Sequence, residues 1–378
     1  MGYRYPPIFL LLFAPLALLP FGISSGLWLF LSVFLALLTG DVLLECLIPT
    51  RITLAARVFI ILLPVLFIAR YFLSSVRYGN AHVILIALLF LSFVFVARKY
   101  ITFAAFATAC VISVKIFPIL LLPYFAFRRQ WKFVGLTVAF ILALNLLPSL
   151  YFGFDTNMAL LREWDQQVVS EPASFSTNGP LNLSLRGQFD RYFTDVDYST
   201  RTTDAAYPEV NFANLDPGAV DVVSVACALL ISMLMLGWIG YTRARSNDPF
   251  QLDLRTGAEL GLLICMTLIV GPRTNITFFI ALALPLAIVF ALLTVRRSPT
   301  DVVLATLIVL IAVAVPLAPG SARQRLLIAG GADIWLTFVV AVALAVRLYQ
   351  YRIGSSDPLV EDSTQLQTFC GLASSHDQ

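Results

Sequence analysis

Long apolar runs constrain what this sequence can fold into more than any other feature. They recur along the chain, and most approach the ~20 residues that a helix needs to cross a bilayer. They lie near residues 8–22, 24–44, 52–72, 80–97, 101–127, 133–153, 219–241, 258–270 with 275–295, 302–316 and 332–348. The pattern predicts an all-α, polytopic integral membrane protein with about 10–11 transmembrane helices.

The composition excludes several other classes of protein. Of the 378 residues, 59% are hydrophobic and 12% are charged, whereas soluble domains carry roughly 25% charged residues. This balance excludes an ordinary soluble enzyme, a disordered chain and a nucleic-acid-binding protein. A membrane barrel would show short alternating segments instead of long runs. The five cysteines are scattered and there are only two histidines, so no metal site is predicted.

Basic residues predict the orientation of the later helices. Arginine-rich short loops recur at every second connection, so the positive-inside rule places them in the cytoplasm. These loops are 128–132, 243–245 and 296–297. The 154–218 segment, the 271–274 turn and the 317–331 loop then face outward. The orientation of the helices before residue 100 stays open, because basic residues there fall on both candidate sides.

The 154–218 segment is the one large element predicted to lie outside the membrane. It holds ten acidic residues and four arginines, which give it a net charge of −6. Because the whole chain has a net charge of +3, the rest of the chain carries +9. A loop of this length is more often functional than decorative. The predicted regions are transmembrane helices over 1–153, the acidic extracytoplasmic loop over 154–218, transmembrane helices over 219–350 and a disordered, cytoplasmic polar tail over 351–378.

Lys115 is the most unusual charge in the sequence, because it lies deep in the apolar run 101–127. A charge at that depth costs several kcal/mol unless it is paired or reaches water. The functional interpretation is a cation that holds a lipid phosphate, and the structural alternative is a lysine that snorkels from a helix end. Pro118 follows closely, so the run is either one tilted helix or two short helices that meet at Lys115.

The acidic loop contains a second set of polar candidates. Arg186 and Arg191, together with Asn182 and Ser184, offer donors suited to a phosphate or to sugar hydroxyls. The alternative is a solvated loop in which the arginines pair with neighbouring carboxylates such as Asp190.

Three further candidates lie at the edges of apolar runs. Arg273 in the outward turn binds a phosphate or contacts lipid headgroups. Asn80 and His82 precede an apolar run, and an interfacial aromatic belt does not account for them. Such a belt does account for Tyr5.

Five short motifs occur in order along the chain. They are Tyr5-Pro6-Pro7, Gly79-Asn80-Ala81-His82, Lys115-Ile116-Phe117-Pro118 before a basic-tryptophan loop, Asn182-Leu183-Ser184-Leu185 with a downstream arginine, and Gly271-Pro272. Together they resemble glycosyltransferase family 87, membrane enzymes of the GT-C fold that are similar to polyprenyl-phosphate-mannose-dependent mannosyltransferases. The resemblance covers most of residues 3–295.

The resemblance implies hexosyl or mannosyl transfer from a polyprenyl-phosphate sugar to a lipid or glycan acceptor on the extracytoplasmic face. It implies no cofactor and no metal, and a multi-pass location in the bacterial inner membrane. An acidic residue would be the general base, and cations would stabilise the leaving phosphate. The candidate bases are Asp155, Asp165 and Asp190. The phosphate-binding candidates are Lys115, Arg186, Arg191 and Arg273, and the substrate-binding candidates are Tyr5, Asn80, His82, Asn182 and Ser184.

The chain departs from the family pattern in two places. Family members usually begin with one more span and an outward loop that bears the acidic catalytic residue. This chain begins after that point, so the span and the loop are expected to be lacking. A histidine often found just after the late Ser-Pro element is also expected to be absent, with Thr277 near its place.

Two other functions stay open on the sequence alone. A secondary transporter or lipid flippase would also use a lysine within the membrane, but it predicts repeats and paired broken helices that the sequence does not show clearly. A non-catalytic remnant of a transferase is the other alternative. The oligomeric state is not predicted.

Overall fold

The described part of the chain folds into helices and contains no strand. The computed structural model describes residues 5–47, 53–166, 182–195, 208–243, 250, 252–295 and 298–353. The helices are α1 (Pro7–Ala17), α2 (Phe21–Leu47), α3 (Leu54–Arg77), α4 (His82–Ala97), α5 (Ile101–Val114), α6 (Leu121–Phe127), α7 (Trp131–Leu146), α8 (Ser149–Phe152), α9 (Phe154–Asp165), α10 (Leu185–Phe193), α11 (Pro217–Arg243), α12 (Leu254–Val270), α13 (Ala283–Val295), α14 (Pro299–Leu317), α15 (Ser321–Ala329) and α16 (Ala332–Ile353), with 3₁₀ helices η1 (Phe117–Leu120) and η3 (Ile276–Leu282).

The helices confirm the predicted all-α, multi-pass membrane protein. Seven stretches of the described residues are long and apolar enough to cross a membrane: Phe21–Leu47, Leu54–Arg77, Trp131–Phe152, Pro217–Arg243, Ile276–Thr294, Pro299–Leu317 and Ala332–Arg352. The remaining predicted runs form shorter helices, α1, α4, α5, α6 and α12. Run 101–127, which the sequence left open, is two helices that meet at Lys115.

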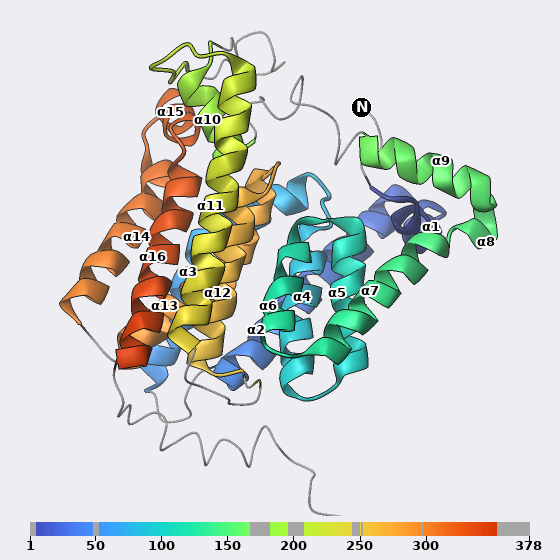
Figure 1. The fold of residues 1–378 in the computed structure, drawn as a ribbon, viewed down its shortest axis with the longest axis horizontal. Helices are drawn as coiled ribbons and strands as arrows, with labels where there is room; N and C mark the ends of the chain where they lie inside the picture. The colour runs from blue at the N-terminus through green and yellow to red at the C-terminus, as the bar shows by residue number, and fades with distance from the viewer. Residues whose placement is uncertain are drawn as a thin grey trace, which may run out of the picture.

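The bundle has two sides that share one core. Helices α3, α11, α12, α13, α14 and α16 pack together on one side, and α1, α4, α5, α6 and α7 form the other (Figure 1). Helix α2 packs against α4, while η3 contacts α3, α4 and α12. Because η3 touches helices from both sides, the largest cluster of buried apolar side chains runs continuously between them.

Three helix hairpins are closed by the same turn. Gly79, Lys99 and Arg129 each adopt a positive φ, of 61°, 62° and 56°. Each is followed by a residue whose amide bonds the carbonyl five positions earlier, which defines the Schellman motif. The closing bonds are Asn80 N to Ser75 O (3.0 Å), Tyr100 N to Phe95 O (2.8 Å) and Gln130 N to Phe125 O (2.9 Å). The Gly79-Asn80 part of the second family motif therefore ends a helix.

Loops predicted to share a side of the membrane lie at the same end of the bundle. Helices α9, α10 and α15, from segments predicted to face outward, lie at one end (Figure 1). At the opposite end, arginines from two loops predicted to be cytoplasmic meet at one carboxylate, Glu259 of α12. Of the predicted polar tail, residues 354–378 lie outside the described residues.

Glu259 joins three helices at that end. Its Oε1 lies 2.6 Å from Arg243 Nη1, and its Oε2 lies 3.0 Å from Arg128 Nη1 and accepts a hydrogen bond of 2.8 Å from the Tyr124 hydroxyl. Arg255 Nε lies 4.0 Å from Oε1. We call Arg128, Arg243, Arg255 and Glu259 the arginine junction.

Replacing Glu259 by glutamine should destabilise the protein strongly. The variant removes the one carboxylate shared by three arginines, and breaking a buried pair in this way costs about 3–5 kcal/mol. The free energy of unfolding, measured by denaturant titration in detergent, should fall by that amount. The control is Glu45→Gln on the exposed side of α2, which should change stability little. Equal losses in the two variants would contradict the role of Glu259.

Candidate functional site

Lys115 lies at a break in the backbone between α5 and η1. Pro118 has no amide hydrogen, and its ring would clash with the carbonyl of Val114, so α5 has to end before it. Lys115 is the C-cap of α5 with extended backbone angles, φ −143° and ψ 113°, and the chain resumes as η1. The half-buried lysine is thus displaced from the face of a continuous helix.

Two aromatic rings flank the Lys115 ammonium. Its Nζ lies 4.9 Å from the ring centre of Tyr5 and 5.7 Å from that of Phe278 in η3, both within the range of a cation–π interaction. Burial raises the pKa of the Tyr5 hydroxyl, and a hydrogen bond with the Ala81 backbone opposes the rise. The structure therefore brings the first three family motifs together at η3.

His82 shares Phe278 with Lys115. Its ring centre lies 4.1 Å from that of Phe278, and its Nδ1 hydrogen-bonds the hydroxyl of Thr277 at 2.9 Å. His82 is 4% exposed, and its Nε2 has no hydrogen-bond partner among the described residues. The site thus joins a cation, an imidazole and a hydroxyl from three separate segments.

A second polar cluster lies on the neighbouring face of η3, and the sequence did not reveal it. Phe279 packs 5.5 Å from the ring of Tyr71, whose hydroxyl donates a 2.6 Å hydrogen bond to Asp333. Arg70 forms an ion pair with the same carboxylate. Asp333 is fully buried, and its Oδ2 has no hydrogen-bond partner in the described part of the chain.

Asn182 holds the acidic loop against the outward turn. Its Oδ1 accepts from the amides of Ser184 (3.2 Å) and Thr274 (3.1 Å), and its Nδ2 donates to Pro272 O (3.1 Å). Ser184 caps α10 by accepting from the Gly187 amide at 3.3 Å. The Asn-x-Ser-Leu motif therefore builds a joint between two outward segments.

Arg191 is engaged by protein carbonyls. Its Nε donates to Ala329 O at 3.1 Å, its Nη1 to Asn182 O at 2.7 Å and its Nη2 to the Gln188 side chain at 2.5 Å. The residue is 2% exposed. Its geometry makes it a link between α10 and the end of α15, instead of a donor that points to a ligand.

Arg186 and Asp190 form an ion cluster with α11. Arg186 Nη2 lies 2.5 Å from Asp221 Oδ1. Burial raises the pKa of Asp190 to about 6; Arg186 and Arg191 oppose the rise, and Asp221 adds to it. The sequence left open whether Arg186 pairs with a carboxylate of the loop; it pairs instead with Asp221 of α11, beyond the end of the loop.

The other two acidic candidates lie on α9, away from Asp190. Helices α9 and α10 occupy opposite sides of the outward end in Figure 1. Asp155 and Asp165 are exposed on α9, which is fixed by buried Asn157 through its bonds to Asn145 O and Ser149 Oγ, both 2.9 Å. Asn145 in turn reaches Ser113, two residues before Lys115.

Arg273 and Asn80 take less defined positions. Arg273 is half-buried in the turn between α12 and η3, next to Thr274 and thus to the Asn182 joint. Asn80 is half-buried, and its amide closes the turn after α3.

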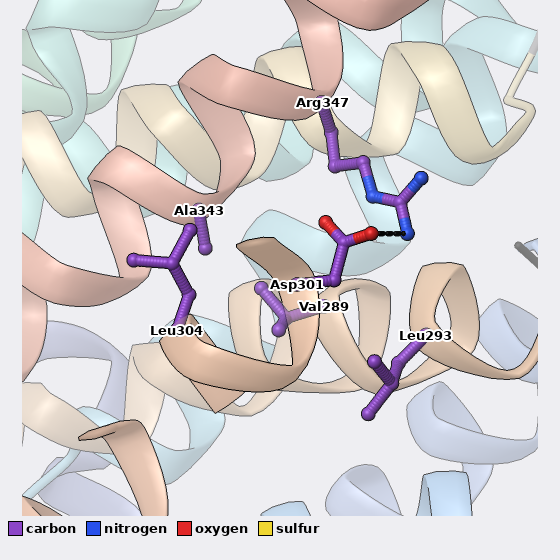
Figure 2. A pocket seen from close by; sticks show the side chains of 6 residues that line it. All are labelled: Val289, Leu293, Asp301, Leu304, Ala343 and Arg347. Carbon is purple, nitrogen blue, oxygen red and sulfur yellow. Dashed lines mark ion pairs between the residues drawn. The ribbon is translucent and has the colours of Figure 1, made fainter. Parts of the chain in front are cut away.

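A crevice at the other end of the bundle contains none of the predicted site residues. Figure 2 shows it between α13, α14 and α16, where Arg347 Nη2 and Asp301 Oδ2 lie 2.5 Å apart. Its lining residues are Val289, Leu293, Asp301, Leu304, Ala343 and Arg347. Asp301 also caps α14 with Ser298, so this ion pair ties the start of α14 to α16.

The comparison with protein families decides which sequence family the chain belongs to. The sequence model of glycosyltransferase family 87 matches residues 3–206, more than half of the chain. The chain belongs to glycosyltransferase family 87. No match was found among curated proteins or among solved structures.

The range that matches the family 87 model includes only part of the candidate site. The matched range includes Tyr5, Asn80, His82 and Lys115, together with the three candidate bases. Arg273, Thr277 and Asp333 lie after its end. The family supports a membrane glycosyltransferase in general and does not specify the sugar.

Asn182→Ala should loosen the joint between the acidic loop and the outward turn. It leaves the buried amides of Ser184 and Thr274 without an acceptor, and each unsatisfied group costs about 1–3 kcal/mol. Limited proteolysis should cleave the loop faster in this variant. Asn211→Ala is the control, because the Asn211 side chain donates to its exposed neighbour Asn214 at 2.9 Å, outside the joint. Equal cleavage rates would contradict the structural role.

Asp190→Asn should change how stability depends on pH. The carboxyl pKa is raised to about 6 in the fold, so the folded state binds more protons than the unfolded state between about pH 4 and 6. Stability contributed by the protonated form is therefore present at low pH and is lost as pH rises through 6. Asparagine mimics the protonated form, so the melting temperature of the variant relative to wild type should rise from pH 4.5 to 7. A difference that stays flat over that range would rule out a raised pKa.

Proposed function

We propose that the chain transfers a hexose, with mannose as the first candidate, from a polyprenyl-phosphate donor to a lipid or glycan acceptor. The reaction would take place at the outward end of a GT-C-like bundle in the bacterial inner membrane. It needs the protein's own side chains, the donor lipid and the acceptor, with no metal or cofactor among its proposed requirements.

The observation that carries this proposal is Lys115 at a helix break, between two aromatic rings and beside His82. A lysine at membrane depth, with its ammonium over two aromatic rings, is a functional candidate by default. In the proposed reaction the departing polyprenyl phosphate is the anion that this charge stabilises, since a cation near the leaving oxygens lowers the barrier to transfer.

The other cations have graded parts in the proposal. Arg273 lies near the same end and is the next candidate for the phosphate. Arg186 forms an ion pair with Asp221, and Arg191 donates to backbone carbonyls. In this proposal the two arginines stabilise the conformation of the loop and do not bind the donor lipid. Asn182 and Ser184 suit the same shaping role.

Asp155 and Asp165 are the better candidates for a general base on the acceptor. Both carboxylates are exposed on α9, and a base must reach the hydroxyl it deprotonates. Helix α9 also packs against α1, which directly follows Tyr5. Asp190 is buried among arginines on the other side, which favours a structural part.

Lys115→Ala should abolish most of the transfer activity. Loss of one electrostatic donor at a developing anion typically lowers the rate about 10²–10³-fold. The measurement is label transferred from radioactive polyprenyl-phosphate mannose into the lipid and glycan fractions of membranes containing the protein. Lys115→Arg, which keeps the charge, should retain part of the activity.

The matched control is Lys132→Ala, an exposed lysine in α7 at the opposite end. It should transfer at the wild-type rate at equal expression. Unchanged transfer by Lys115→Ala would remove Lys115 from the mechanism, and wild-type transfer of a different hexose instead of mannose would correct the sugar.

A further inference from the structure

The arginine junction carries more positive charge than its carboxylate balances. Three guanidinium groups converge on Glu259, the one acid whose side chain they share. Asp253 caps α12 nearby, where it accepts from the Thr256 amide at 2.7 Å. Within the junction and its neighbour Asp253, three arginines against two acids leave one formal positive charge. Glu259 is fully buried, whereas the Arg255 side chain is 24% exposed. The excess positive charge is therefore accessible at Arg255.

The junction also holds two donors whose acceptors are not found in the described part of the chain. Arg128 Nη2 and Arg255 Nε are buried and have no hydrogen-bond partner among the described residues. The Arg128 side chain is 5% exposed, and that of Arg255 is 24% exposed. A buried donor left without an acceptor costs about 1–3 kcal/mol. The exposed edge of Arg255 offers the way in for an external acceptor.

Helix ends and aromatic rings define the depth of the junction. Arg128 follows the last residue of α6, Arg243 ends α11 and Arg255 is in the first turn of α12. The ring of Phe127 packs close to Gly240, where an added Cβ would come within 3.4 Å. Phe127, Trp131 and Tyr241 are exposed around these ends. Exposed aromatic rings at helix ends are typical of the headgroup layer.

We propose that the arginine junction binds the phosphate of an anionic phospholipid headgroup in the leaflet at this end of the bundle. A phosphodiester carries one negative charge, which matches the one uncompensated positive charge. Its oxygens accept from guanidinium groups in the fork geometry that arginine favours. The glycerol and upper acyl chains then lie against the exposed rings. This site is separate from the proposed donor site at Lys115, and it does not depend on the proposed function.

The alternative is a junction that only ties helices together. Arg255 supports that role too, because its Nη2 donates to Thr242 O at 2.9 Å at the end of α11. A purely structural junction would affect stability equally in every lipid. A lipid site makes the stability depend on the headgroup, and this difference separates the two.

The experiment compares headgroups on the purified full chain. Protein in neutral detergent receives phosphatidylglycerol, phosphatidylcholine or inorganic phosphate at equal concentration, and its melting temperature is recorded. Phosphatidylglycerol should raise the melting temperature of the wild type above the value in phosphatidylcholine. In Arg255→Gln the apparent affinity for phosphatidylglycerol should fall about fivefold, since one basic side chain near an anionic headgroup contributes roughly that factor. Arg255→Lys keeps the charge and should retain most of the effect.

Arg98→Gln is the matched control. Arg98 occupies the same position in the turn after α4 that Arg128 occupies after α6, with φ −82° and −74° respectively, but it is exposed and outside the junction. Its variant should keep the full response to phosphatidylglycerol. An equal response in wild type and Arg255→Gln, or an equal loss in Arg98→Gln, would overturn the proposal. The full shift with inorganic phosphate alone would overturn a lipid as its source.

Native mass spectrometry provides a second readout that does not depend on the stability of the variant. Wild type and Arg98→Gln should retain phosphatidylglycerol in preference to phosphatidylcholine, and Arg255→Gln should lose that preference. Equal retention of the two lipids by the wild type would count against the site.

Discussion

Two interruptions of helical backbone meet inside this bundle, and the candidate site exists because they meet. A membrane interior offers no water to unpaired amides and carbonyls, so irregular backbone is tolerated only where protein covers it. The break at Lys115 is covered by η3, whose Phe278 ring lies over the lysine. The break after α12 begins at Gly271-Pro272 and continues into η3. Each interruption therefore shields the other, and polar side chains gather at their contact.

The membrane helices and the motif order could be predicted from the sequence, because both depend on local information. Apolar runs give spans directly, and Pro118 marks a break wherever the helix lies in space. The roles of Asn182 and Arg191 could not be predicted. Side-chain amides and guanidinium groups in an outward loop can donate hydrogen bonds to sugars and phosphates as well as to backbone carbonyls. Only the fold shows that Arg191 donates to the Ala329 carbonyl and Asn182 to the Pro272 carbonyl.

The missed residues share one physical feature: each is a carboxylate in an apolar helix whose partner comes from a distant segment. Glu259 meets arginines from α6 and α11, and Asp333 meets Arg70 from α3. The acids give no sequence signal of their most distant partners, because Arg128 is 131 residues from Glu259 and Arg70 is 263 residues from Asp333. Arg243 and Arg255 are nearer to Glu259 in sequence, at 16 and four residues. The Arg128–Glu259 pair joins the two sides of the bundle, whereas Arg70–Asp333 ties α3 to α16 within one side. A buried charge without its partner would be strongly destabilising.

His82 shows why a contact carries more information than a motif position. The resemblance implies a histidine just after the late Ser-Pro element, and Thr277 stands near that place. Compared position by position, that is a departure from the family. In space, however, the His82 imidazole of α4 and the Thr277 hydroxyl lie 2.9 Å apart. An imidazole is thus present at η3, supplied by α4, and its Nε2 is directed away from Thr277. The chemistry available beside Lys115 includes that ring even though its position along the chain has changed.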